Sequence, residues 1–108
     1  MPLYKIEFSY TPEAWAALCA SPEDRSEPVR ALAESMGGRL VSFYYSFGEY
    51  DGFAIFEAPD NLSAGTASLT AVAPGHLSSI RTTPIFTVEE TMQMMGRAGE
   101  MTLRRPGR

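Results

Sequence analysis

The sequence contains only one cysteine and one histidine in 108 residues. A single cysteine excludes a disulfide within the chain and is consistent with a reducing compartment. Cys19 and His76 cannot supply the Cys and His ligands of a usual zinc site, so we predict no metal site. A catalytic pair of Cys19 and His76 is also disfavoured, because we expect Cys19 to be buried on a helix face.

Long apolar runs and targeting segments are missing as well. The N-terminus has neither the basic region nor the apolar run of a signal peptide. No stretch reaches the length that a membrane-spanning helix needs. We therefore expect a small soluble, cytoplasmic domain with no membrane partner.

Basic residues are few outside the C-terminal end. Residues 1–95 hold five Lys or Arg against twelve Asp or Glu, whereas residues 96–108 hold four Arg and one Glu. This acidic body argues against nucleic acid as a partner, because a nucleic-acid-binding surface is basic. The glycine- and arginine-bearing segment 96–108 predicts a poorly ordered tail.

Motifs for common cofactors and nucleophiles are absent. Gly37-Gly38 follows a predicted helix and precedes a strand, which is the reverse of a phosphate-binding loop. The chain has no Gly-x-Ser-x-Gly segment, which would mark a nucleophilic serine. We predict no cofactor.

A central pair of apolar strands is present in residues 39–58. Two runs rich in β-branched and aromatic residues flank Gly48-Glu49-Tyr50-Asp51-Gly52, as in antiparallel strands joined by a short turn. Alternation places Val41, Phe43, Tyr45 and Phe47 on one face of the first strand. In the second strand Phe53 and Ile55 share one face, and Ala54, Phe56 and Ala58 share the other. The pair is apolar on both sides and needs cover on both.

The first third of the chain predicts a strand and a broken helix. Residues 3–10 alternate as a half-buried strand does. Thr11 and Pro12 suit the N-cap and first turn of a helix, which Pro22 interrupts and which resumes near Ser26. Gly37-Gly38 ends this helical region.

The last third predicts a helix, a strand and a short final helix. Asp60 offers an N-cap, and the apolar face of this helix would carry Leu62, Thr66, Leu69 and Ala73. Residues 76–86 have strand character, and Pro84 points to an edge of the sheet. Thr87 and Glu90 form a capping box at the start of the final helix.

This order of elements predicts an α+β, ferredoxin-like βαββαβ fold with a four-stranded antiparallel sheet and an extra C-terminal helix. We expect residues 1–95 to form this domain and residues 96–108 the tail. Both main helices would cover one face of the sheet, and the sequence leaves open which face that is. The other face would carry Phe or Ile from several strands, so we expect a homodimer through it.

Three motifs carry a resemblance to a known family. They are Tyr10-Thr11-Pro12-Glu13-Ala14-Trp15, Gly37-Gly38-Arg39-Leu40 and Gly48-Glu49-Tyr50-Asp51. Together they resemble the GYD-domain family over roughly residues 2–95. The resemblance implies a ferredoxin-like fold of the dimeric α/β-barrel type and implies no established reaction. Gly52 departs from the family pattern, in which an apolar strand residue usually follows the turn.

Three groups of polar residues are candidates for a ligand-binding site. Tyr50 and Asp51 could supply a hydroxyl and a carboxylate at a pocket rim, although Asp51 is also a residue that turns need. His76 could titrate near neutral pH and Arg81 could bind a carboxylate, although both also suit a solvated surface. Tyr44, with Ser42, Lys5 and Glu7, could line one sheet face or complete a dimer interface.

Three functions fit these observations. The first is a domain that binds a small apolar or aromatic molecule between sheet and helices. The second is a cofactor-independent isomerase or monooxygenase of the dimeric α/β-barrel kind, an inference from fold analogy. The third is a purely structural self-association module. The sequence identifies no catalytic residue.

Overall fold

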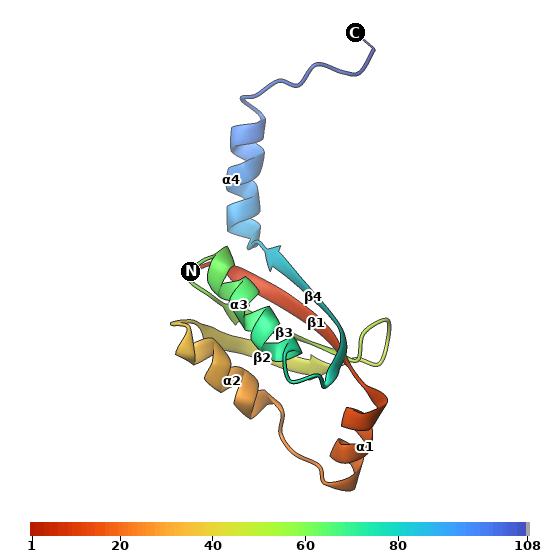
Figure 1. Ribbon diagram of the computed structural model, residues 1–108. Helices are drawn as coiled ribbons and strands as arrows, with labels where there is room; N and C mark the ends of the chain where they lie inside the picture. The colour runs from red at the N-terminus through yellow and green to blue at the C-terminus, as the bar shows by residue number, and fades with distance from the viewer. Residues whose placement is uncertain (108) are drawn as a thin grey trace.

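The computed structural model describes residues 1–107 (Figure 1). The elements are β1 (Leu3–Tyr10), α1 (Pro12–Ala20), α2 (Ser26–Ser35), β2 (Arg39–Tyr45), β3 (Gly52–Glu57), α3 (Asn61–Val72), β4 (Leu77–Ile85) and α4 (Val88–Ala98). The strands form one sheet in the order β2-β3-β1-β4, and every neighbouring pair is antiparallel. Helices α2 and α3 lie on one face of it (Figure 1). The predicted α+β, ferredoxin-like fold is confirmed.

The core lies between this sheet and helices α2 and α3. Tyr4 of β1 is opposite Phe56 of β3, and their stacked rings are 5.6 Å apart between centroids. Ala33 of α2 and Ala64 of α3 complete the same buried cluster. Full burial of one such aromatic side chain contributes on the order of 2 to 3 kcal/mol. The sheet therefore supplies the large core residues and the helices supply small ones.

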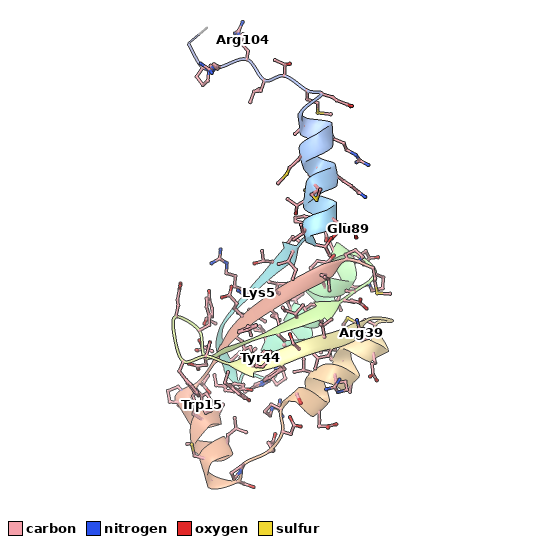
Figure 2. The ribbon with its side chains drawn as sticks, turned by 180° about the vertical axis from the view of Figure 1, so that it is seen from behind. Lys5, Trp15, Arg39, Tyr44, Glu89 and Arg104 are labelled. Atoms are coloured by element: carbon pink, nitrogen blue, oxygen red, sulfur yellow. The ribbon has the colours of Figure 1, made fainter. Side chains whose placement is uncertain are left out.

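We call the other side of the sheet the outer face, and the strand register shows which residues lie on it. It carries Lys5 and Glu7 of β1, Ser42 and Tyr44 of β2, Phe53 and Ile55 of β3, and Arg81 and Thr83 of β4. Figure 2 views the sheet from this side, where no helix of residues 1–107 covers it. Pro84 lies in β4, an edge strand, as its inability to donate a ladder hydrogen bond predicts.

The predicted apolar face of α3 is wrong. Its buried residues are Ala64 and Ala67, whereas Leu62 and Leu69 are 81% and 73% exposed. The aromatic rings of the sheet already fill the space beneath α3, so the helix packs closely only through small side chains. The hydrophobic spacing did not reveal this, because alanine is weak evidence of burial.

The predicted face of the first hairpin strand is also wrong in part. The register of β2 against β3 shifts between Leu40 and Ser42, which leaves Val41 as the extra residue of a bulge. Leu40, Phe43 and Tyr45 consequently share the helix-covered face of the sheet. One inserted residue exchanges the faces of a strand, which explains why simple alternation placed Val41 with Phe43.

Helices α1 and α2 are separate, as the interruption at Pro22 predicted. The Thr11 hydroxyl accepts a hydrogen bond from the Ala14 backbone N–H at 3.1 Å, so Thr11 is the N-cap of α1. No residue of α1 is fully buried, and the helix extends beyond the end of the sheet (Figure 1). The expectation that Cys19 is buried is wrong, because the side that carries it faces solvent.

Helix α4 points away from the sheet (Figure 1). The predicted capping box is present, with Glu90 N–H donating to the Thr87 hydroxyl at 3.0 Å and Thr87 N–H donating to the Glu90 carboxylate at 2.9 Å. The helix runs to Ala98 and so includes the start of segment 96–108, whose poor order stays a prediction. Met92 and Met95 are exposed on it. Within residues 1–107, no helix is both long enough and apolar enough to cross a membrane.

Gly37 and Gly38 perform different tasks at the end of α2. Gly37 has a φ of 78°, the left-handed conformation that suits a helix C-terminus. Gly38 instead lies against the neighbouring strand, where the Cβ atom of any other residue would be 1.9 Å from the Glu57 carbonyl oxygen. The close approach of α2 to β3 therefore requires glycine at position 38.

We expect Gly38→Ala to lower the free energy of unfolding by about 3 kcal/mol, because backbone must move to admit the methyl group. Gly65→Ala is the control: Gly65 lies in α3 with open space around its Cα, and alanine should raise stability by up to about 1 kcal/mol. Urea unfolding followed by circular dichroism measures both. Equal effects of the two substitutions would contradict the close contact at Gly38.

Candidate functional site

Asp51, in the turn between β2 and β3, connects three parts of the chain. One oxygen of its carboxylate accepts hydrogen bonds from the Tyr10 backbone N–H at 3.0 Å and from the Trp15 indole N–H at 2.9 Å. Its own backbone N–H donates to the Phe8 carbonyl at 2.8 Å. The turn is thereby tied to the end of β1 and to α1. The sequence suggested that Asp51 bonds within its turn, whereas these partners lie far from it along the chain.

An aromatic cluster surrounds this connection. The Trp15 ring contacts the rings of Tyr10, Tyr45 and Phe47, with centroid separations of 5.0, 5.8 and 5.6 Å. The hydroxyls of Tyr10 and Tyr45 lie 3.1 Å apart and share a hydrogen bond. Trp15 and these three partners, which we call the aromatic cluster, hold α1 against the end of the sheet.

A pocket of about 510 Å³ lies beside α1, between that helix, residues 21–25 and the start of β4. We call it the Tyr10 pocket. Ala14, Ala17 and Leu18 of α1 form one apolar wall, and Pro74 adds apolar surface from the segment before β4. Its volume and mainly apolar lining are those of a site for a small organic molecule.

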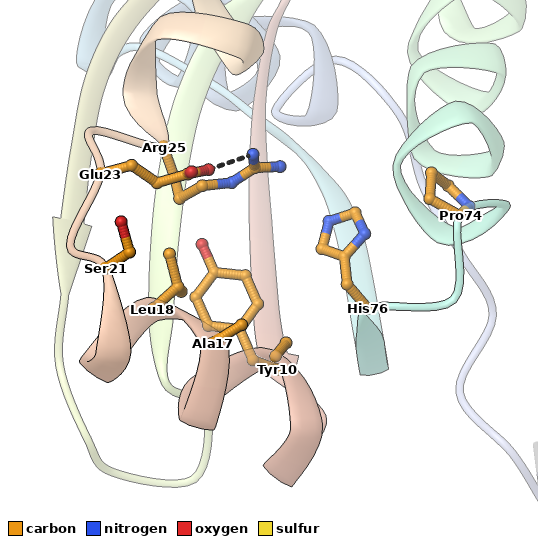
Figure 3. Close-up of a pocket in the computed structure, with 9 residues that line it drawn as sticks. Tyr10, Ala17, Leu18, Ser21, Glu23, Arg25, Pro74 and His76 are labelled. Atoms are coloured by element: carbon orange, nitrogen blue, oxygen red, sulfur yellow. Dashed lines mark hydrogen bonds and ion pairs between the residues drawn. The ribbon is translucent and has the colours of Figure 1, made fainter.

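Polar groups converge in the same pocket (Figure 3). The Arg25 guanidinium donates to the Glu23 carboxylate at 2.8 Å and lies between that carboxylate and the His76 ring. The Tyr10 hydroxyl points toward the same region (Figure 3). The pocket therefore combines apolar walls with a cation, a phenol and an imidazole.

Burial sets the protonation of these groups. Burial, reinforced by the hydrogen bond with Tyr45, raises the pKa of the Tyr10 hydroxyl well above its ordinary value, so Tyr10 stays protonated. Burial, reinforced by the nearby charge of Arg25, lowers the pKa of His76 below its ordinary value. The hydrogen bond to Glu23 raises the pKa of Arg25. At neutral pH the pocket thus presents a phenol, a neutral imidazole and the Arg25–Glu23 ion pair.

A second hollow of about 350 Å³ adjoins α1 and shares Leu18 and Glu23 with the Tyr10 pocket. Trp15, Cys19 and Phe47 contribute to its lining. Helix α1 is therefore flanked by hollows, which explains why none of its residues is fully buried.

The structure does not bring the predicted site residues together. His76 lines the Tyr10 pocket. Asp51 does not line it but accepts hydrogen bonds from Tyr10, which does, and from Trp15. Tyr50 is half-buried in the turn, where its carbonyl accepts a hydrogen bond from Gly48 N–H at 3.1 Å. Tyr44 and Arg81 lie on the outer face, together with Ser42, Lys5 and Glu7.

Sequence reasoning did not identify two members of the pocket. The alternation of residues 3–10 places Tyr10 in a strand and gives no sign that its hydroxyl lies at a cavity. Arg25 lies in the break between α1 and α2, next to the interruption at Pro22. A lone cation at a helix break is the sequence signal that could have found it. Within the part of the chain described, no three His, Cys, Asp or Glu side chains gather as metal ligands.

We expect Asp51→Ala to destabilise the protein by about 2 to 4 kcal/mol, because it leaves the Tyr10 N–H and the Trp15 indole N–H without their charged acceptor. Trp15 emission should shift to the red as α1 loosens. Glu49→Ala, an exposed change in the same turn, should alter stability by less than about 0.5 kcal/mol. Denaturant unfolding and fluorescence spectra test this; wild-type stability in Asp51→Ala would refute the role of Asp51.

Comparison with protein families finds that the model of the GYD domain matches residues 4–95. No curated protein matches the chain. The matched range contains β1 apart from its first residue, the other three strands, both donors to the Asp51 carboxylate and the whole Tyr10 pocket. It also confirms the resemblance that the three sequence motifs indicated. The chain belongs to the GYD-domain family.

Proposed function

We propose that this protein is a homodimer that binds a small apolar or aromatic molecule in the Tyr10 pocket. One observation carries the binding proposal: α1 has no fully buried residue, yet Ala14, Ala17 and Leu18 wall a hollow of about 510 Å³. A bound molecule would give this wall the apolar contacts that the described chain does not provide.

The dimer proposal rests on the composition of the outer face. Phe53 lies at its centre, with the Tyr44 ring 5.8 Å away and the Lys5 ammonium 5.5 Å from its centroid. Ile55 lies on the same face of the same strand. This apolar centre is left uncovered by helices α1 to α4 and suits a second copy of the same surface.

Charges around that centre also suit a two-fold contact. Lys5 pairs with Glu7 at 3.8 Å, and Arg39 pairs with Glu57 at 3.2 Å. A surface that carries both signs of charge can meet its own copy without net repulsion. Lys5 and Glu7 lie on β1 opposite Ile55 and Phe53, so a two-fold contact would enclose this ion pair together with the apolar residues.

A cofactor-independent isomerase or monooxygenase acting on an aromatic or quinone-like molecule is the second candidate. One observation favours it: the lowered pKa of His76 leaves a neutral imidazole in the pocket, able to accept a proton at neutral pH. Turnover that His76→Ala abolishes, with the fold and ligand binding intact, would favour the enzyme. A purely structural self-association module, the third candidate, would dimerise without binding any ligand.

We expect native mass spectrometry of the freshly purified protein to find a dimer that carries an additional small mass. The neutral probe N-phenyl-1-naphthylamine should gain fluorescence on binding the emptied protein. Ala17→Phe should weaken this binding at least about tenfold, because it fills the pocket wall. Ala16→Phe, at a position of the same helix that lines neither hollow beside α1, should not. If both variants bind the probe equally well, the probe does not bind in the Tyr10 pocket.

We expect Phe53→Glu to convert the dimer to a monomer, because the change puts two like charges at the centre of the contact. Leu62→Glu is the control, since Leu62 is 81% exposed on α3, on the opposite side of the sheet. Sedimentation equilibrium gives the mass, and circular dichroism verifies the fold. A monomeric wild-type protein, or a dimer that survives Phe53→Glu, would exclude this interface.

A further inference from the structure

We propose that the ligand of the Tyr10 pocket is a small aromatic or apolar acid whose carboxylate is bound by Arg25. This inference rests on the proposed function and specifies the class of ligand. The Arg25 guanidinium lies at the polar end of the pocket, whose other walls are apolar (Figure 3).

Arg25 has more donors than its ion pair with Glu23 uses. A guanidinium carries five N–H donors, and the bond to the Glu23 carboxylate, 2.8 Å long, comes from Nη1 alone. The guanidinium lies between Glu23 and His76, so its remaining edge faces the His76 side of the pocket (Figure 3). The Arg25 side chain is 28% exposed and so remains accessible. A carboxylate fits such an edge with two parallel hydrogen bonds.

The neighbouring groups complete a carboxylate site. The Tyr10 hydroxyl points toward the same region, and when Tyr45 donates the hydrogen bond that the two hydroxyls share, the Tyr10 proton is free for an oxygen of the ligand. His76 is neutral, so Arg25 alone provides the positive charge that the ligand carboxylate would meet in the pocket lining. Ala14, Ala17 and Leu18 face the rest of the ligand, which must therefore be apolar. A pocket with polar groups at one end and apolar walls at the other suits an organic acid with an apolar body.

The charge count favours a monoanion over a phosphate. Glu23 already offsets one positive charge, and Arg25 is the single cation among the residues of 1–107 that line the pocket. The helix N-termini beside the pocket already have side-chain acceptors, because the Asp24 carboxylate accepts from the Ser26 backbone N–H at 2.9 Å and the Thr11 hydroxyl accepts from the Ala14 backbone N–H at 3.1 Å. A doubly charged phosphate usually needs several cations or a free helix N-terminus. The pocket lining offers neither.

The test compares 2-naphthoate with its neutral analogue 2-naphthamide, using the whole chain freed of any co-purified molecule. Isothermal titration should show 2-naphthoate binding about ten- to a hundredfold more tightly, the range expected for a hydrogen bond to a charged group. Arg25→Gln should abolish this preference and leave 2-naphthamide unaffected. Arg30→Gln, on the exposed surface of α2, should leave both affinities unchanged.

Glu23→Gln provides an opposite prediction that does not depend on loss of folding. Removal of the competing carboxylate should tighten 2-naphthoate binding severalfold and leave 2-naphthamide unchanged. Equal affinity for the two compounds, or a preference that survives Arg25→Gln, would overturn the carboxylate site while the proposed binding function stands. Failure of both compounds and of the neutral naphthylamine probe to bind would refute the proposed function as well.

Discussion

The Asp51 carboxylate is the constraint on which one end of this molecule depends. A single oxygen accepts from the end of β1 and from the indole of α1, while the backbone of the same residue bonds to Phe8. Helix α1 buries no residue fully, so its position depends on a few contacts, chiefly those of Trp15. The hydrogen bond to Trp15 and the rings around it supply that position. The Tyr10 pocket exists because α1 is held at this distance from the sheet.

In the core, the large side chains come from the sheet and the small ones from the helices. Aromatic residues of the sheet fill most of the volume, and α2 and α3 approach through Ala33 and Ala64. Gly38 permits the chain to pass within contact distance of Glu57. Small residues on helices thus determine how closely the two layers pack, and the large leucines of α3 are left on the surface.

The sequence predicted those features that local chemistry decides. The N-cap at Thr11, the break at Pro22, the left-handed glycine at position 37 and the capping box at Thr87 each depend on neighbouring residues alone. Features that depend on distant contacts were not predictable in this way. The bulge at Val41 depends on its pairing with β3, and the partners of Asp51 lie 36 and 41 residues away. The pocket belongs to this second class, since Tyr10, Arg25 and His76 come from three separate segments.

The outward direction of α4 affects how the whole molecule moves through solution. The radius of gyration of the described chain is 17.5 Å, and its longest extent is 60 Å. A compact chain of this length would have a radius of gyration of about 13 Å, and a compact chain with the observed value would contain about 235 residues. One elongated copy therefore has the hydrodynamic size of a compact protein of about twice its mass. Gel filtration, which responds to size, would give a single chain and a compact pair similar elution volumes.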